Sequence, residues 1–100
     1  MLGEKLKALR EAKGLVQRQI AACLEVDTAY VSKMECNEKP VSRNYLKKLS
    51  VLLEISERDL LTLWLADRIY DLVKDEKFAA NAIQIAEKEL LKSQQYSAKR

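Results

Sequence analysis

Histidine is absent from this 100-residue sequence, and glycine and proline are scarce, with two copies and one copy. The lack of histidine removes the usual general base of enzymes and the commonest metal ligand. Cys23 and Cys36 match no zinc-ligand spacing, and two unpatterned cysteines suit a reduced compartment. Because glycine and proline form most tight turns, their scarcity argues against β-hairpins and predicts an all-α chain with short connections.

A long apolar run is also lacking. The first residues begin no signal-like segment, and the most apolar stretch, Leu60–Val73, is short and interrupted by Asp67, Arg68 and Asp71. We therefore expect a cytoplasmic protein with no membrane contact. No pattern indicates a cofactor, a metal or a small-molecule ligand. No nucleophile stands beside a base either, so we predict that the chain is not an enzyme.

Positive charge is concentrated in the first half of the chain, although the net charge is only +3. Residues 1–56 hold ten Lys and Arg against seven Asp and Glu, whereas residues 57–100 hold eight of each. This asymmetry is compatible with a nucleic-acid surface in the first half and a neutral packing surface in the second. It is weak evidence alone, because many proteins that bind no DNA carry such an excess.

Apolar residues recur at helical spacing in the first part of the chain. They predict a helix over about residues 2–13, ended by Gly14. Two shorter helices are predicted over 17–24 and 28–35, with Asp27 as the N-cap of the second. Its C-terminal cap is Asn37, a residue type that tolerates the left-handed conformation.

The rest of the chain predicts three more helices. Ser42 can cap a fourth, and Ser56 can open a fifth over about 57–74 with a capping box. A sixth is expected over about 76–93. The remaining residues, Ser93–Arg100, are polar and predict a frayed tail.

The two eight-residue helices cannot be stable alone and must be held by their neighbours. Ala21 lies where they cross, and the apolar residues that lock the crossing are Ile20, Val31 and Met34. A DNA-reading helix pair requires such a fixed crossing, because its second helix must protrude into a groove about 12 Å wide. We therefore predict a helix-turn-helix at Gln17–Cys36. The alternative is a helical core whose spacing matches by coincidence.

Over residues 2–61 the sequence resembles the phage-repressor (Xre-type) helix-turn-helix regulators. The resemblance rests on segments at the right distances from one another: LKALREAKGL at Leu6–Leu15, QRQIA at Gln17–Ala21, VSKME at Val31–Glu35, and Pro40 with the helix-four stripe. It implies a compact, repressor-like DNA-binding domain of about five helices with a C-terminal helical extension. Two departures stand out: Glu25 replaces the usual turn glycine, and Val16 replaces a capping Ser or Thr.

The resemblance also implies roles for single residues. Positions that face the bases are Thr28, Ala29, Ser32 and Lys33. Positions that contact the DNA backbone are Gln17, Arg18, Tyr30, Asn37 and Arg43. Arg10 and Glu35 match a family ion pair that ties the first helix to the end of the third. Alternatives remain open: Lys33 contacting a phosphate, Tyr30 partly buried, Ser32 merely small, and Arg18 solvated.

Beyond Ser56 the chain has more apolar residues than one helix of a small monomer can bury. We predict that residues 1–56 form the DNA-binding domain and that residues 57–100 form a dimerisation region. Its two-fold interface would use Leu61, Trp64, Leu65, Ile69, Phe78 and Ile83. The alternative is an intrachain hairpin that extends the core.

The function predicted from these features is that of a sequence-specific transcriptional regulator. It would act as a homodimer on a two-fold site in double-stranded DNA and read the major groove with helix 28–35. The alternative is an antitoxin or adaptor whose apolar C-terminal helices bind a partner protein. A restriction–modification controller and a phage-type repressor fit the sequence equally well.

Overall fold

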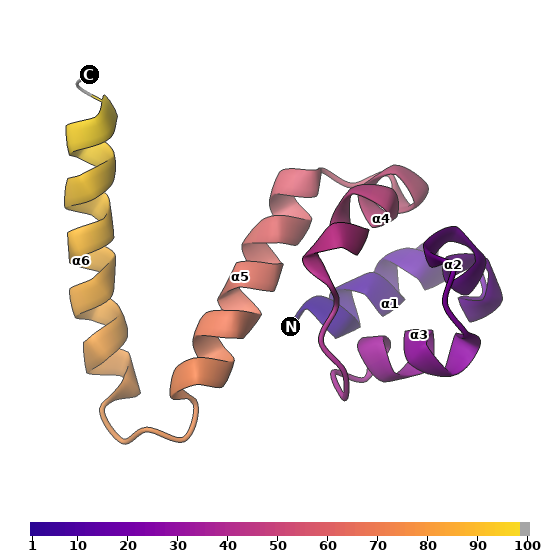
Figure 1. The fold of residues 1–100 in the computed structure, drawn as a ribbon, viewed down its shortest axis with the longest axis horizontal. Helices are drawn as coiled ribbons and strands as arrows, with labels where there is room; N and C mark the ends of the chain where they lie inside the picture. Colours follow the sequence, from indigo (N-terminus) through magenta and orange to yellow (C-terminus); the bar gives the residue numbers. More distant parts are fainter. Residues whose placement is uncertain (99–100) are drawn as a thin grey trace. The chain divides into compact units, whose positions relative to one another are not determined.

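The structure is a computed structural model that describes residues 1–98, with side chains to Gln94. Over this range the chain is all-α, as predicted, with six α-helices, one 3-10 turn and no strand (Figure 1). The elements are α1 (Leu2–Ala12), α2 (Gln17–Leu24), α3 (Thr28–Glu35), η1 (Arg43–Tyr45), α4 (Leu46–Leu53), α5 (Glu57–Val73) and α6 (Ala79–Ala98).

The chain divides into two compact units. The N-terminal unit is Met1–Ile69, and the C-terminal unit begins at Tyr70. The N-terminal unit therefore continues past residue 56, where the sequence predicted a boundary. The reason is that Leu60 of α5 is fully buried in its core, and Trp64 Nε1 donates a hydrogen bond to Val41 O at 2.6 Å. The first turns of α5 thus belong to the same core as α1–α4.

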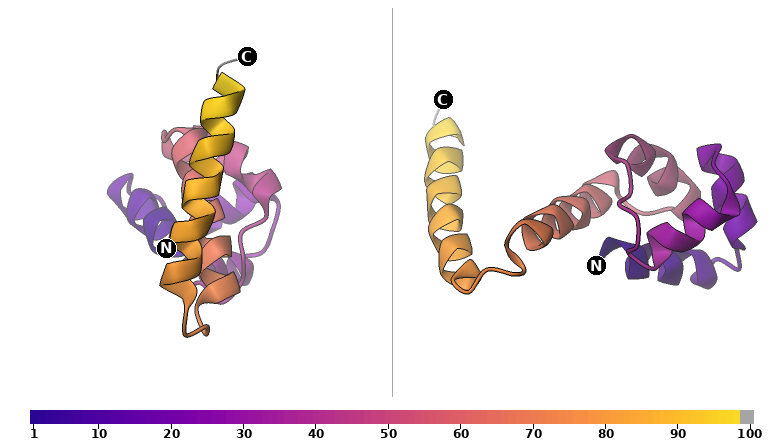
Figure 2. Two further views of the ribbon diagram at one scale, coloured as in Figure 1. Left: turned by 90° about the vertical axis from the view of Figure 1, so that its left-hand side faces the viewer. Right: turned by 60° about the horizontal axis from the view of Figure 1, so that its bottom comes forward.

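The core of the N-terminal unit is built from one apolar face of each helix. Figure 1 and the right view of Figure 2 show α1–α4 lying close to one another. Because each short helix buries its apolar stripe against the others, packing supplies the stability that eight-residue helices lack. The buried residues are Leu2, Leu6, Ile20, Ala21, Leu24, Val31, Met34, Val41, Leu46, Leu49, Leu53 and Leu60.

Local capping explains where several helices begin. Asp27 Oδ1 accepts a hydrogen bond from Tyr30 N at 2.7 Å, which confirms Asp27 as the N-cap of α3. Ser56 Oγ accepts from Asp59 N at 3.4 Å at the start of α5. Ser42 caps η1 rather than α4 itself, accepting from Asn44 N, so that the fourth helix is entered through a 3-10 turn.

The C-terminal unit contains the last turn of α5 and all of α6. Backbone bonds from Glu76 N to Val73 O and from Ala79 N to Glu76 O form turns in the connection, so α6 begins later than predicted. The helix continues to Ala98, where a frayed tail was predicted from Ser93, because no glycine or proline interrupts it. Residues 99–100 of that predicted tail lie outside the described residues. Within residues 1–98, no helix is long and apolar enough to cross a membrane.

Candidate nucleic-acid interface

α2 and α3 pack against each other. Ala21 is buried, and Val31 and Met34 of α3 are almost completely excluded from solvent. The turn between the helices places Glu25 in the left-handed region, at φ 59°, the position where a glycine is usual. Val26 N donates to Ala21 O at 3.0 Å and closes the turn. Glu25 therefore adopts the turn conformation without a glycine.

The face of α3 opposite its buried residues is open to solvent. Thr28, Ala29 and Lys33 are exposed, and Ser32 is partly buried. Because Val31 and Met34 anchor the other side of the helix, this face has a fixed orientation. The four side chains predicted to face bases therefore lie on an outer surface of a helix that the core holds in place.

A buried charged network fixes α3 relative to α1 and α2. Glu35 is 5% exposed, and its carboxylate accepts from Arg10 Nε at 2.7 Å and from Arg10 Nη2 at 3.1 Å. Arg10 Nη1 also donates to Leu15 O at 2.9 Å. The hydrogen bond to Glu35 raises the pKa of Arg10, although burial opposes the shift. The predicted ion pair between α1 and the end of α3 is thus present in the structure.

The same carboxylate holds the first residue of α2. Gln17 Nε2 donates to Glu35 Oε1 at 3.0 Å, so the side chain predicted to contact DNA is turned to an internal partner. Val16 provides no side-chain cap, and Val16 N instead donates to Gln19 Oε1 at 2.8 Å. The Gln17 backbone amide stands at a helix N-terminus, where free N–H groups and the helix dipole favour an anion. Arg18 beside it is exposed.

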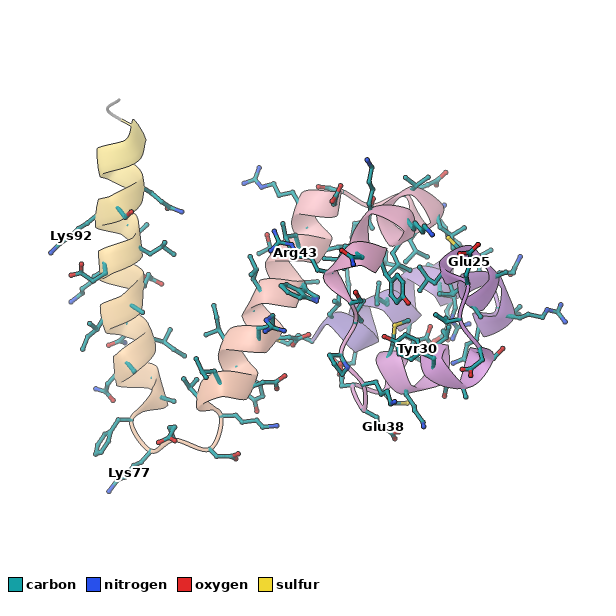
Figure 3. All side chains as sticks on the ribbon, viewed as in Figure 1. Glu25, Tyr30, Glu38, Arg43, Lys77 and Lys92 are labelled. Atoms are coloured by element: carbon teal, nitrogen blue, oxygen red, sulfur yellow. The ribbon has the colours of Figure 1, made fainter. Side chains whose placement is uncertain are left out.

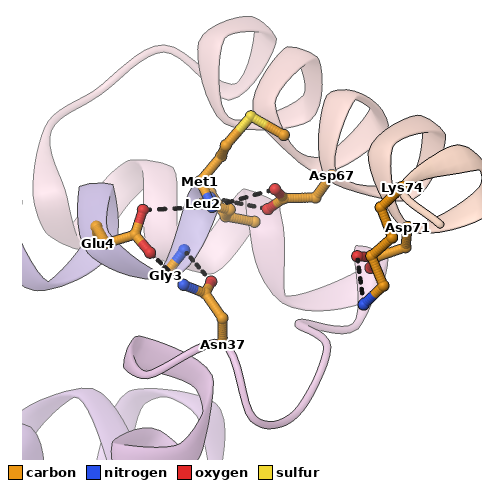
Figure 4. Close-up of polar contacts among 8 residues, drawn as sticks. All are labelled: Met1, Leu2, Gly3, Glu4, Asn37, Asp67, Asp71 and Lys74. Atoms are coloured by element: carbon orange, nitrogen blue, oxygen red, sulfur yellow. Dashed lines mark hydrogen bonds and ion pairs between the residues drawn. The ribbon is translucent and has the colours of Figure 1, made fainter. Parts of the chain in front are cut away.

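Two residues predicted to contact the DNA backbone have polar partners within the chain. Tyr30 is partly buried, its hydroxyl donates to Pro40 O at 3.2 Å, and its ring packs edge-on against Tyr45. Burial, and then Tyr45, raises the pKa of the Tyr30 hydroxyl, which therefore stays a donor. Asn37 adopts φ 61°; its Oδ1 accepts from Gly3 N at 3.2 Å and its Nδ2 donates to Glu4 (Figure 4).

Arg43, the last predicted backbone contact, is exposed and lies beside α5 (Figure 3). Its Cζ is 5.6 Å from the centre of the Trp64 ring, and Arg68 Cζ is 4.8 Å from the same ring. The sequence did not indicate that Trp64 and Arg68 are surface partners of Arg43. Trp64 and Arg68 are four residues apart on one helix, so the sequence could have indicated that these two side chains meet. Nothing in the sequence near them links them to Arg43.

The predicted dimer residues fall into two groups. Leu61 and Trp64 are partly buried against the core of their own chain, which leaves less of each side chain for an interface between chains. Leu65, Ile69, Phe78 and Ile83 are exposed large apolar residues. Trp64 lies one helical turn after the fully buried Leu60 and therefore shares its face of α5.

Two short packed helices joined by a tight turn, with an exposed face on the second and no side-chain cap at the start of the first, are the features of a DNA-binding helix-turn-helix protein. A family model described as "Helix-turn-helix domain" matches residues 1–63, and the chain belongs to this family. It is also similar to a chain in the solved SinR protein/SinI protein complex, with a TM-score of 0.54, 22% identity and 100% coverage of both chains. At that identity the likeness shows the fold alone. No curated protein matches the chain significantly.

Proposed function

We propose that this protein is a sequence-specific transcriptional regulator that binds a two-fold DNA site as a homodimer. The observation that carries the proposal is the open face of α3. Thr28, Ala29 and Lys33 are exposed on a helix whose opposite side is locked into the core. Lys33 can donate to guanine O6 and N7, Thr28 can bond a base edge, and Ala29 can touch a thymine methyl.

Contacts to the DNA backbone would come from the start of α2 and from η1. The Gln17 amide, the Arg18 side chain and the Arg43 guanidinium supply donors for phosphate oxygens. Tyr30 and Asn37 are not included, because their polar atoms bond to groups of the same chain. The network of Arg10 and Glu35 has a structural role, since it holds the two helices at their crossing angle.

The homodimer is supported by apolar side chains that the chain itself leaves exposed. In the C-terminal unit Phe78 is 69% exposed, and Ile83, Ile85, Leu90 and Leu91 are exposed along α6. Such a series of apolar residues on a soluble helix is typical of a surface that a second copy covers. Two subunits would place two copies of α3 in successive major grooves, about 34 Å apart.

Two substitutions separate base reading from backbone contact. Lys33→Ala should lower the ratio of affinities for the preferred and a scrambled duplex, because a specific base contact contributes about 1–3 kcal/mol of discrimination. Fluorescence anisotropy of labelled duplexes measures both affinities. If Lys33→Ala leaves the ratio and the preferred site unchanged, Lys33 does not read bases.

Gln17→Pro tests the backbone contact at α2. Proline is tolerated at the first position of a helix, and the preceding Val16 is already extended at φ −101° and ψ 161°. The variant removes the amide donor, whereas Gln17→Ala removes the side chain and keeps that donor. We expect Gln17→Pro to bind all duplexes more weakly than Gln17→Ala does. Equal binding by the two variants would exclude the amide contact.

A further inference from the structure

The helix pair that reads DNA carries few positive charges. α2 contains one cation, Arg18, and α3 contains one, Lys33. Affinity for duplex DNA comes largely from phosphates neutralised by Lys and Arg, so two cations per subunit leave much of that attraction to other elements. The inference below rests on the proposed function and concerns other cations of the N-terminal unit.

Trp64 holds two guanidinium groups on one aromatic ring. Arg43 Cζ lies 5.6 Å and Arg68 Cζ 4.8 Å from the centre of the indole, distances at which a guanidinium is attracted to the ring face. The ring itself is fixed, because it packs against the core and Nε1 donates to Val41 O at 2.6 Å. The fixed Trp64 ring therefore contacts one guanidinium group from η1 and one from α5.

Neither guanidinium is neutralised within the described side chains: the ion pairs found there include neither Arg43 nor Arg68. The two carboxylates nearest to Arg68 along α5 are engaged with other groups (Figure 4). Asp67 Oδ2 accepts from Leu2 N at 2.8 Å, and Asp71 pairs with Lys74 at 3.9 Å. Two like charges within roughly a Debye length, about 10 Å at 0.1 M salt, repel each other, and a bound anion relieves that repulsion.

The segment that carries Arg43 is packed against α3. Tyr30 of α3 donates to Pro40 O at 3.2 Å, and its ring centre lies 6.3 Å from that of Tyr45, the last residue of η1. η1 begins at Arg43, so these contacts hold the Arg43 segment beside α3. Side-chain contacts therefore join α3 to η1 and η1 to α5 within the N-terminal unit.

We propose that Arg43 and Arg68, held on Trp64, form a second phosphate-binding site for the DNA whose major groove α3 reads. The occupant is the sugar–phosphate backbone beside the groove. Guanidinium groups suit it because their paired N–H donors match two phosphate oxygens. The new element is α5, which then contacts DNA through Arg68 although it lies outside the helix-turn-helix.

The salt dependence of binding tests this site. Arg68→Gln removes one phosphate contact per subunit, so the slope of log affinity against log salt should fall by about one unit per bound subunit. The ratio of affinities for preferred and scrambled duplexes should stay unchanged, because a phosphate contact carries no base information. Arg68→Lys, which keeps the charge, should retain most of the slope.

Arg58→Gln is the matched control: it removes an exposed arginine of the same helix that has no aromatic partner among the described side chains. It should leave the slope at its wild-type value. Trp64 provides an independent signal, because it is the single tryptophan of the sequence. Its emission should change over the same DNA concentrations at which anisotropy reports binding.

An Arg68→Gln slope equal to that of the wild type, or Trp64 emission that saturating DNA leaves unchanged, would overturn the phosphate site. If Lys33→Ala still reduces discrimination in that case, the proposed function stands without α5. A wild-type chain that binds neither duplex overturns the proposed function, and this site with it.

Discussion

At the scale of single residues, Glu35 connects three elements of the N-terminal unit. Its carboxylate is 5% exposed and bonds to Arg10 of α1 and to Gln17 of α2. A buried charge destabilises the fold unless an opposite charge pairs with it, so Glu35 and Arg10 depend on each other. The network therefore fixes both the angle of α3 and the position of the α2 N-terminus.

Glu35→Gln should strongly destabilise the fold, because it leaves Arg10 as a charge without its carboxylate. Breaking a buried pair by removing one partner costs about 3–5 kcal/mol, and we expect a loss of free energy of unfolding near the lower end of that range. Urea denaturation followed by circular dichroism measures it. Glu54→Gln, which breaks the exposed pair with Lys13, is the control and should have a much smaller effect. Equal losses in the two variants would contradict this account of Glu35.

The Lys13–Glu54 pair predicts a pH dependence. The hydrogen bond and then the charge of Lys13 lower the pKa of Glu54 from 4.5. A carboxyl with a lowered folded pKa stabilises the fold above its unfolded pKa and loses that effect as pH falls through the folded value. Wild type should melt slightly above Glu54→Gln at pH 7, and the difference should vanish in acid. A melting difference that is the same at pH 7 and pH 3 would exclude this pair as its source.

At the scale of elements, α1 and α3 approach closely where Gly3 lies. A Cβ at this position would stand 2.5 Å from Met34 O and 2.9 Å from Glu35 O, both backbone atoms of α3. Gly3 N also donates to Asn37 Oδ1 at 3.2 Å (Figure 4). The end of α3 therefore packs directly against the start of α1.

Gly3→Ala should destabilise the protein, although alanine is the better helix former by about 1 kcal/mol. The added methyl group would push α1 away from α3, and overpacking of this kind costs about 1–3 kcal/mol. Thermal melting measures the net effect. A higher melting temperature in Gly3→Ala than in wild type would show that the contact yields easily and would contradict the close approach.

The sequence predicted α2 and α3 at their observed bounds because their start and stop signals are local. Asp27 caps α3, and Asn37 takes the left-handed conformation near its end. The end of α6 was placed too early, since polar residues alone do not stop a helix that lacks glycine and proline. The internal partners of Tyr30 and the ring shared by Arg43 and Arg68 depend on the fold, because they join residues far apart in the sequence.

At the scale of the whole molecule, the apolar residues of α5 form two sets. One set packs against the core of the same chain, and the other stays exposed. Leu60 is buried and Leu61 partly so, whereas Leu65 and Ile69 are exposed. The sequence showed an excess of apolar residues but did not show which ones the intrachain core takes. That division depends on how α5 packs against α1–α4, which the periodicity of one helix does not specify.

The proposed dimer predicts a mass near twice that of the 11.5 kDa chain. The double variant Phe78→Ser with Ile83→Glu should shift the protein toward monomer, because it introduces polar and charged groups on the proposed interface. Sedimentation equilibrium at micromolar concentration measures the change. Val51→Ser is the control, since Val51 is an exposed apolar residue of α4 outside that interface.

A wild-type mass of 11.5 kDa would exclude the homodimer. A wild-type chain that is monomeric alone but forms a stable complex with a different protein would favour a partner for these helices other than a second copy. In either case the helix-turn-helix surface is unaffected, because its residues all lie in the N-terminal unit.

Selection of preferred sites from random duplex DNA tests the central claim most directly, since it reports binding, base reading and symmetry together. The account predicts an enriched sequence made of two inverted half-sites about 34 Å apart, with the preference weakened in Lys33→Ala. The absence of any enriched sequence, or an enriched sequence that Lys33→Ala selects unchanged, would contradict it.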